Sequence, residues 1–228
     1  KVSLVTLSET RHILLINCHH IIADGWSISL IIRELSEGYA RIESGTTPSV
    51  LPPRAFSDYA FSQQEVVANS EEDAFWCSYL NNLPTTPWLP TDFPRPEKQS
   101  HAGASFELAL SNTLSTQVKQ WSREQGLTLY MSLKAAFDIT LALYSGHYDI
   151  VVGTPVSGRE SNKGEDWRQT VGLFINNLVL RSQVLPEKTV STLIAEVKQD
   201  CLRSFAHQAM PFERLVELLQ PDRDLSSS

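Results

Sequence analysis

The sequence predicts a mixed α/β fold, because short aliphatic runs alternate with segments whose apolar residues recur every three or four positions. Of the 228 residues, 42% are hydrophobic and 20% are charged, which is ordinary for a globular protein and enough to build a core. We find no internal repeat and no low-complexity segment.

The first part of the chain is predicted to begin with two strands joined by a turn and to continue in helices. The second strand is apolar enough to be buried on both faces. A helix follows an Asp-Gly turn, and Ser27 is its predicted cap. The predicted elements are strands at 2–6 and 12–17 and helices at 28–39, 56–67 and 71–80.

A proline-rich stretch divides the chain. Within thirteen residues it contains Pro84, Pro87, Pro90, Pro94 and Pro96. Such a segment sustains neither a helix nor a central strand, so we expect an extended crossover. The predicted division is therefore 1–84, a crossover at 85–103, and 104–228.

The second part of the chain is predicted to mix strands and helices. Alternation of Phe106, Leu108 and Leu110 favours a strand. Gly126 and Gly146 are expected to end the two helices that follow, and Pro211 to start the last helix. The predicted elements are strands at 104–110, 149–155 and 171–184 and helices at 113–124, 130–144, 190–206 and 212–219.

Charge and cysteine content exclude several classes of protein. A net charge of −7, with no basic run, argues against a nucleic-acid-binding protein. The three scattered cysteines form no CxxC pair and suit a reducing compartment, so we expect a cytoplasmic protein. No apolar run approaches the roughly 20 residues of a membrane span. Because both ends are abrupt, we expect a fragment that lacks both ends of its domain.

Two adjacent histidines, His19 and His20, follow the second predicted strand. Neighbouring side chains of a strand point to opposite faces, so one histidine can face a cleft while backbone groups hold the other. Asp24 orders the turn, and Gly25 permits close backbone approach. The helix start directs free N–H groups at the same space. This combination suits acyl transfer, which needs proton management and oxyanion donors.

Other interpretations of the histidine pair are weaker or remain open. A metal site is disfavoured, because only two histidines and one carboxylate are close and the two histidines diverge. A serine triad has no support, since the chain has no Gly-x-Ser-x-Gly elbow. A pair of core histidines without a function remains open on spacing alone.

The segment from His19 to Gly25 resembles the HHxxxDG motif of the condensation domains of nonribosomal peptide synthetases, and the Trp-Ser pair after it also fits. Five further segments resemble motifs of this family in the same order. They are 56–60 (FSDYA), 149–159 (DIVVGTPVSGR), 171–177 with Arg181 (VGLFINN), 207–213 (HQAMPFE) and 223–226 (RDLS).

The resemblance implies a partial chloramphenicol acetyltransferase-like fold of two lobes with a tunnel between them. Residues 1–84 would be the end of the N-terminal lobe, and 104–228 most of the C-terminal lobe. The implied reaction joins a donor acyl thioester to the α-amine of an acceptor aminoacyl thioester. Implied partners are donor and acceptor peptidyl carrier protein domains and an adjacent adenylation domain. The domain itself would bind no cofactor or metal. Its substrates would be attached to the phosphopantetheine arms of the carrier domains.

The resemblance also assigns roles to the residues of the motif. His20 matches the family's active-site histidine and His19 the supporting one. Asp24 matches a structural aspartate whose arginine partner is expected in a family motif upstream of Lys1. Gly25 could offer its N–H to the reacting thioester.

Three further residues are candidates for substrate binding: Trp26, Ser27 and Asn176. Arg159 and Arg181 are ion-pair candidates with no assigned role. Two positions depart from the family pattern. Asn177 stands where threonine is usual, and Ala209 where aspartate is common.

Alternative functions within the same fold are an epimerization domain, a stand-alone acyltransferase and a non-catalytic domain that docks carriers. The glycine after Asp24 and the Phe-Ile-Asn-Asn segment favour condensation over epimerization.

Overall fold

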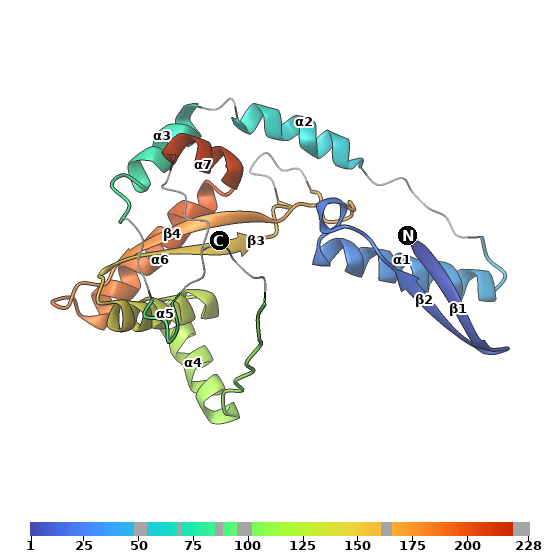
Figure 1. Cartoon of the computed structure of the whole chain (residues 1–228), viewed down its shortest axis with the longest axis horizontal. Helices are drawn as coiled ribbons and strands as arrows, with labels where there is room; N and C mark the ends of the chain where they lie inside the picture. The colour runs from blue at the N-terminus through green and yellow to red at the C-terminus, as the bar shows by residue number, and fades with distance from the viewer. Residues whose placement is uncertain (48–53, 68–69, 85–88, 95–101, 161–165, 221–228) are drawn as a thin grey trace. The chain divides into compact units, whose positions relative to one another are not determined.

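The computed structural model describes residues 1–47, 54–67, 70–84, 89–94, 102–160 and 166–220 (Figure 1). It has the predicted mixed class, with helices and two small sheets. The chain forms two compact units. Unit 1 comprises residues 1–68 and 155–176, and unit 2 comprises 69–154 and 177–228. The division at a crossover over 85–103 stays a prediction. Parts of that stretch, and the motif segment 223–226, lie outside the described residues.

Unit 1 opens with an antiparallel hairpin. Strands β1 (Val2–Ser8) and β2 (Arg11–Ile16) pair in a register that sets Leu4 opposite Leu14. The predicted burial of the second strand is wrong, since Ile13 to Ile16 are 37–52% exposed. Among the described residues this sheet has two strands only, which is too little structure to cover both faces of β2.

A 3₁₀ turn (His20–Ile22) separates the hairpin from helix α1 (Gly25–Glu43), and α2 (Phe56–Val67) follows. The N-cap of α1 is Asp24, whose carboxylate accepts the Ser27 N–H at 2.8 Å. The prediction that Ser27 caps this helix is therefore wrong. Aspartate is a strong N-cap, and its position three residues before Ser27 allows the helix to begin earlier than predicted.

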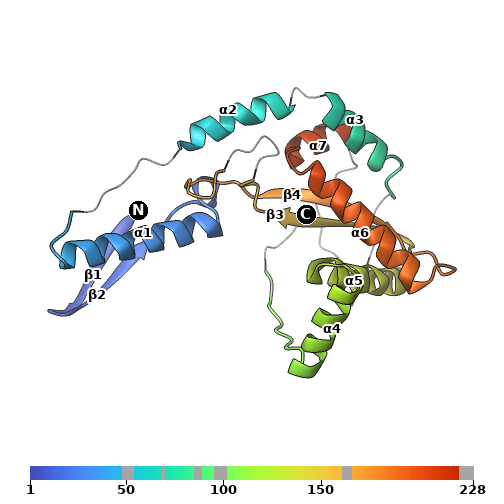
Figure 2. The ribbon, with the colours of Figure 1, turned by 180° about the vertical axis from the view of Figure 1, so that it is seen from behind.

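Unit 2 holds the larger core. Helices α5 and α6 pack against each other and against strand β4 (Figure 2). Its elements are α3 (Ser70–Tyr79), α4 (Asn112–Glu124), α5 (Leu129–Ser145), most of β3 (Asp149–Val156) and of β4 (Asn176–Gln183), α6 (Val190–Ala206) and α7 (Phe212–Leu219). The core cluster consists of Leu127, Met131, Ala135, Leu180, Leu193, Ile194, Val197 and Cys201.

The predicted helices agree with the structure to within a few residues. The predicted terminators are also confirmed, since Gly126 and Gly146 follow α4 and α5 with φ of 64° and 71°. These left-handed conformations cost glycine little, so each helix stops there.

Two predicted strands differ from the structure. Residues 104–110 form no strand, and Phe106 and Leu108 are 90% and 77% exposed. The strand predicted over 171–184 begins only at Asn176. The backbone of Gly172 and Phe174 is hydrogen-bonded to Ser27 and Asp24, so it is not available for strand pairing.

Within the described residues, no single helix is long and apolar enough to cross a membrane. Helices α4 and α5 have the length and composition of a membrane span only when they are taken together, and the chain bends by 106° between them.

Candidate active site

A buried ion pair holds the Asp-Gly turn of unit 1. The Nη2 atom of Arg159 lies 2.7 Å from Oδ1 of Asp24, and each side chain is only 1% exposed. The second guanidinium nitrogen, Nη1, donates to the carbonyl groups of Trp167 at 3.0 Å and Thr170 at 2.6 Å. Arg159 thus ties the turn to the 167–170 segment.

This finding corrects the predicted partner of Asp24. An arginine upstream of Lys1 was expected, and Arg159 was left without a role; in this structure Arg159 is the partner. Sequence reasoning missed it because the two residues are 135 positions apart. The only sign of it in the sequence was an arginine in the loop that follows strand β3, directly after Gly158.

Ser27 is the second centre of the same network. It is fully buried, and its hydroxyl contacts Oδ1 of Asp24 at 2.8 Å, the Gly172 carbonyl at 2.8 Å, the Gly172 N–H at 3.0 Å and Nη2 of Arg159 at 2.9 Å. Ser27 was predicted to contact substrate, and in this structure its side chain is buried inside the network. Its role in this structure is to join α1 to residue 172.

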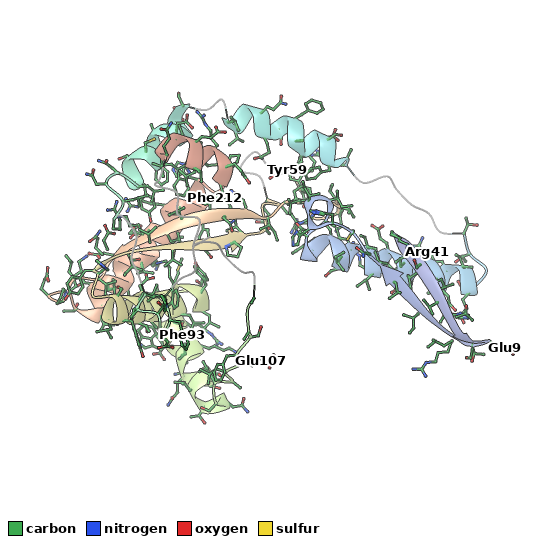
Figure 3. The ribbon with its side chains drawn as sticks, in the orientation of Figure 1. Glu9, Arg41, Tyr59, Phe93, Glu107 and Phe212 are labelled. Carbon is green, nitrogen blue, oxygen red and sulfur yellow. The ribbon has the colours of Figure 1, made fainter. Side chains whose placement is uncertain are left out.

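Aromatic rings enclose the guanidinium of Arg159. Its central carbon lies 4.1 Å from the ring centre of Phe174 and 5.8 Å from that of Trp26. Tyr59 of α2, labelled in Figure 3, packs on Phe174 at 4.5 Å and on Trp167 at 5.7 Å. This environment suits the delocalised charge of arginine better than that of lysine.

Burial and hydrogen bonding act in opposite directions on Asp24. Burial raises the pKa of its carboxyl group, but hydrogen bonds from Ser27, the Phe174 N–H and Arg159 outweigh that effect. The pKa therefore lies below its ordinary value. Asp24 is ionised at neutral pH, and both of its carboxylate oxygens accept hydrogen bonds. This state suits a structural role better than proton transfer.

The two histidines lie beyond the strand, not in it. Strand β2 ends at Ile16, so the predicted alternation of His19 and His20 across a strand is wrong. The Nδ1 atom of His19 accepts the Ile21 N–H at 3.1 Å, although the side chain is exposed and not held inside. The Ala23 N–H donates to the His20 carbonyl at 3.3 Å.

His20 lines a cleft of about 670 Å³ in unit 1. Asp24 and Gly25 line the same cleft. Three predicted site residues are thus brought together. The other four, His19, Trp26, Ser27 and Asn176, are not among the residues that line it. Trp26 is half exposed and donates its indole N–H to the Arg168 carbonyl at 2.9 Å.

Gly25 is the first residue of α1 and faces open space. A Cβ atom there would meet no atom within 4 Å, and its φ is not in the left-handed region. Neither backbone strain nor packing in this chain requires glycine at position 25. The absence of a side chain leaves room beside His20 for a ligand.

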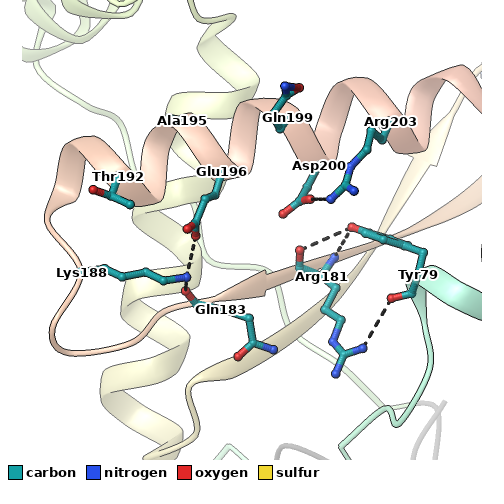
Figure 4. A pocket seen from close by; sticks show the side chains of 10 residues that line it. All are labelled: Tyr79, Arg181, Gln183, Lys188, Thr192, Ala195, Glu196, Gln199, Asp200 and Arg203. Carbon is teal, nitrogen blue, oxygen red and sulfur yellow. Dashed lines mark hydrogen bonds and ion pairs between the residues drawn. The ribbon is translucent and has the colours of Figure 1, made fainter.

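A larger cavity, of about 1120 Å³, lies in unit 2 between β4 and α6 (Figure 4). Its lining includes Arg181, Lys188 and Arg203, and each of these cations is paired with an acidic residue at 2.6 Å or less. None of the predicted site residues lines it. Among the described residues, no group of three or more His, Cys, Asp or Glu side chains could hold a metal ion.

Comparison with known proteins identifies the family. The profile of the Condensation domain matches residues 1–228, so the chain belongs to the condensation-domain family. One of the linear gramicidin synthase proteins of Brevibacillus parabrevis is 38% identical to it over 232 residues, which cover all of this chain and 3% of that protein. Tyrocidine synthase 3 of the same organism is 37% identical over 227 residues, which cover 99% of this chain and 3% of that protein.

Solved structures share the fold. The X-domain from teicoplanin biosynthesis superposes with a TM-score of 0.87 at 24% identity, and the match covers this whole chain and 52% of the X-domain chain. A four-domain nonribosomal peptide synthetase bound to AMP and glycine gives a TM-score of 0.84 at 26% identity, over this whole chain and 17% of that one. The chain therefore spans about half of the first structure and a small part of the second.

Proposed function

We propose that this protein forms a peptide bond between a donor acyl thioester and the α-amine of an acceptor aminoacyl thioester. The observation that carries the proposal is the position of His20 in a cleft beside Gly25, on a turn that the buried Asp24–Arg159 pair holds. Membership of the condensation-domain family supports the same reaction.

The reaction forms one C–N bond and breaks one C–S bond. The acceptor amine attacks the donor carbonyl, and the thiolate of the donor's arm leaves. One proton passes from the amine nitrogen to the leaving sulfur, either directly or through a group that accepts and then releases it. An α-amine has a pKa of about 8, and a desolvated site favours its neutral, nucleophilic form.

His20 can serve this reaction in two ways. Its imidazole can accept the proton of the attacking amine, which typically contributes roughly 100- to 10,000-fold in rate. It can instead hydrogen-bond the amine and orient it, and positioning contributes at least as much. In both cases the imidazole must lie in the cleft, so both roles require the same turn geometry.

The N-terminus of α1 is suited to the developing oxyanion. The first N–H groups of a helix have no intrahelical partner, and the helix dipole favours negative charge there. The backbone of Gly25 carries one of these groups at the cleft wall. Asp24 and His19 are assigned supporting roles in the turn, and Trp26 and Asn176 remain candidates for contact with substrate.

The proposed partners are donor and acceptor carrier domains whose phosphopantetheine arms deliver the two thioesters. We also propose an adenylation domain in the same synthetase. These partners are supported by the similarity to peptide synthases and to a solved four-domain synthetase.

The experiment that tests this function supplies the full-length protein with a loaded donor carrier and a loaded acceptor carrier. Intact-mass spectrometry then identifies what each carrier holds, and chiral analysis of the released amino acid gives its stereochemistry. A dipeptidyl group on the acceptor carrier supports condensation. An unchanged aminoacyl mass with inverted stereochemistry would instead mean epimerization, transfer to a free amine would mean a stand-alone acyltransferase, and unchanged carriers would mean docking alone.

A further inference from the structure

The wall of the cleft beside His20 is mainly apolar. Leu15, Ile16, Ala23 and Ile28 contribute to it. Ala23 is buried and Ile28 is half buried, so surrounding structure fixes both side chains. Leu15 is 52% exposed and can change rotamer to fit a ligand.

The cleft offers little to a charged ligand group. Among the described lining residues, the charged side chains are Asp24 and Lys1. Both carboxylate oxygens of Asp24 already accept hydrogen bonds, and Arg159 neutralises its charge. Lys1 is exposed to water. A charged substrate side chain would therefore lose hydration in this cleft without gaining a buried partner.

Ile28 is the residue best placed to limit the size of a ligand by steric contact. Its N–H donates to the Asp24 carbonyl at 3.1 Å, in the first turn of α1. Residues three positions apart share a helix face, which sets Ile28 on the face of Gly25. Ile32, one turn further along, is 55% exposed and is not among the cleft residues.

We propose that the cleft beside His20 takes the uncharged aliphatic side chain of one of the two thioester substrates, and that Ile28 limits the length of this side chain. The inference rests on the proposed function, because the cleft holds a substrate group only if His20 serves a reaction there. Methylene groups gain binding free energy on leaving water for such a wall, whereas an ammonium or carboxylate group loses it.

The test uses the full-length protein with carriers loaded with norleucine, lysine or glutamate. These side chains are similar in reach and differ in charge. The donor is varied against a fixed glycyl acceptor, and the acceptor is then varied against a fixed donor. We expect kcat/KM for norleucine to exceed that for lysine and glutamate at least tenfold at one of the two positions, which identifies the substrate that uses the cleft.

Equal kcat/KM values for the three side chains at both positions would overturn the inference while leaving the proposed function intact. Failure to form peptide from any pair would overturn the proposed function, and the inference with it. The two failures are thus distinguishable by the presence of product.

Substitution of Ile28 tests the residue assignment. Ile28→Glu should shift the ratio of lysyl to norleucyl kcat/KM at least tenfold toward lysine, because the new carboxylate pairs with the ammonium group. Ile28→Ala should shift preference toward a side chain longer than norleucine. Ile32→Glu and Ile32→Ala, on the same helix, should leave both preferences unchanged.

Thermal unfolding establishes that the variants are folded. If Ile28→Glu does not fold, Ile28→Ala still tests the role of Ile28 through the preferred length of the substrate side chain. Wild-type preference in a folded Ile28→Ala protein would overturn the role of Ile28.

Discussion

Asp24 and Arg159 lie 135 positions apart and form an ion pair in which Nη2 is 2.7 Å from Oδ1 and both side chains are buried. The pair joins the turn that carries His20 to the segment that contains Trp167 and Thr170. The geometry of the cleft therefore depends on a residue far from it in the sequence.

Removal of Arg159 should strongly destabilise the protein. Arg159→Met leaves the Asp24 carboxylate buried without its counter-ion, which costs about 3–5 kcal/mol. The free energy of unfolding, measured with urea, checks this value. The matched control is Arg168→Met, since Arg168 pairs with Asp166 at the surface, where both side chains are about half exposed. We expect that change to cost far less stability, because water screens an exposed ion pair.

A double-mutant cycle with Asp24→Asn measures the coupling itself. Asp24→Asn alone should reduce stability and rate together, because the residue braces the turn. Additive losses in the double variant would contradict a direct ion pair. A variant that melts like the wild type but is inactive would instead assign Asp24 a direct role in catalysis.

Acid should weaken unit 1 through Asp24. Its pKa is lower in the folded protein than in the unfolded chain, so the ionised carboxylate stabilises the fold above about pH 4. This contribution is lost as the pH falls from about 4 through the lower, folded-state pKa. Urea unfolding at pH 7 and in steps below pH 4 should show a smaller acid-induced loss in Asp24→Asn than in the wild type. Equal losses would contradict the lowered pKa.

Gly25→Ala should separate stability from activity. A Cβ at this position meets no protein atom, and alanine favours helix more than glycine, so the protein should be as stable as the wild type or up to about 1 kcal/mol more stable. The methyl group should lower the rate of condensation at least tenfold, because it occupies the space beside His20. Thermal melting and the carrier assay measure the two effects. An unchanged rate would mean that Gly25 is only a turn residue.

Gly158 is predicted to be required by the fold. Its φ is 61°, and a Cβ would lie 2.0 Å from the carbonyl oxygen of Phe174, a backbone atom that cannot easily move. Gly158→Ala should cost at least about 1–3 kcal/mol and disturb the adjacent Arg159. The control is Gly38→Ala within α1, where a Cβ meets nothing and alanine should stabilise by up to about 1 kcal/mol.

Local patterns predicted most of the fold. Helices α4 to α7 follow from apolar periodicity, and α4, α5 and α7 also from a terminal glycine or proline, which are properties of neighbouring residues. The predicted strand at 104–110 failed because alternation establishes which side chains share a face, whereas strand pairing requires a partner elsewhere in the chain. The predicted burial of β2 was wrong for the same reason, because burial of a strand requires other parts of the chain to cover it.

The part of the site that lies within one short segment of the sequence was predictable. The segment from His20 to Gly25 was identified from its own residues and the resemblance they carry, and His20, Asp24 and Gly25 line one cleft. The partner of Asp24 was not predictable, because Arg159 reaches it only through tertiary folding. The hydrogen bonds between the Ser27 hydroxyl and the backbone of Gly172 were not predictable for the same reason.

The central claim is that His20 serves peptide-bond formation, and the rate at which the acceptor carrier gains the donor acyl group tests it most directly. His20→Ala should reduce this rate at least 100-fold while both carriers still load. His12→Ala should leave the rate unchanged, because His12 lies in the hairpin and contacts Thr6. A folded His20→Ala protein that forms the dipeptidyl carrier at the wild-type rate would contradict the claim.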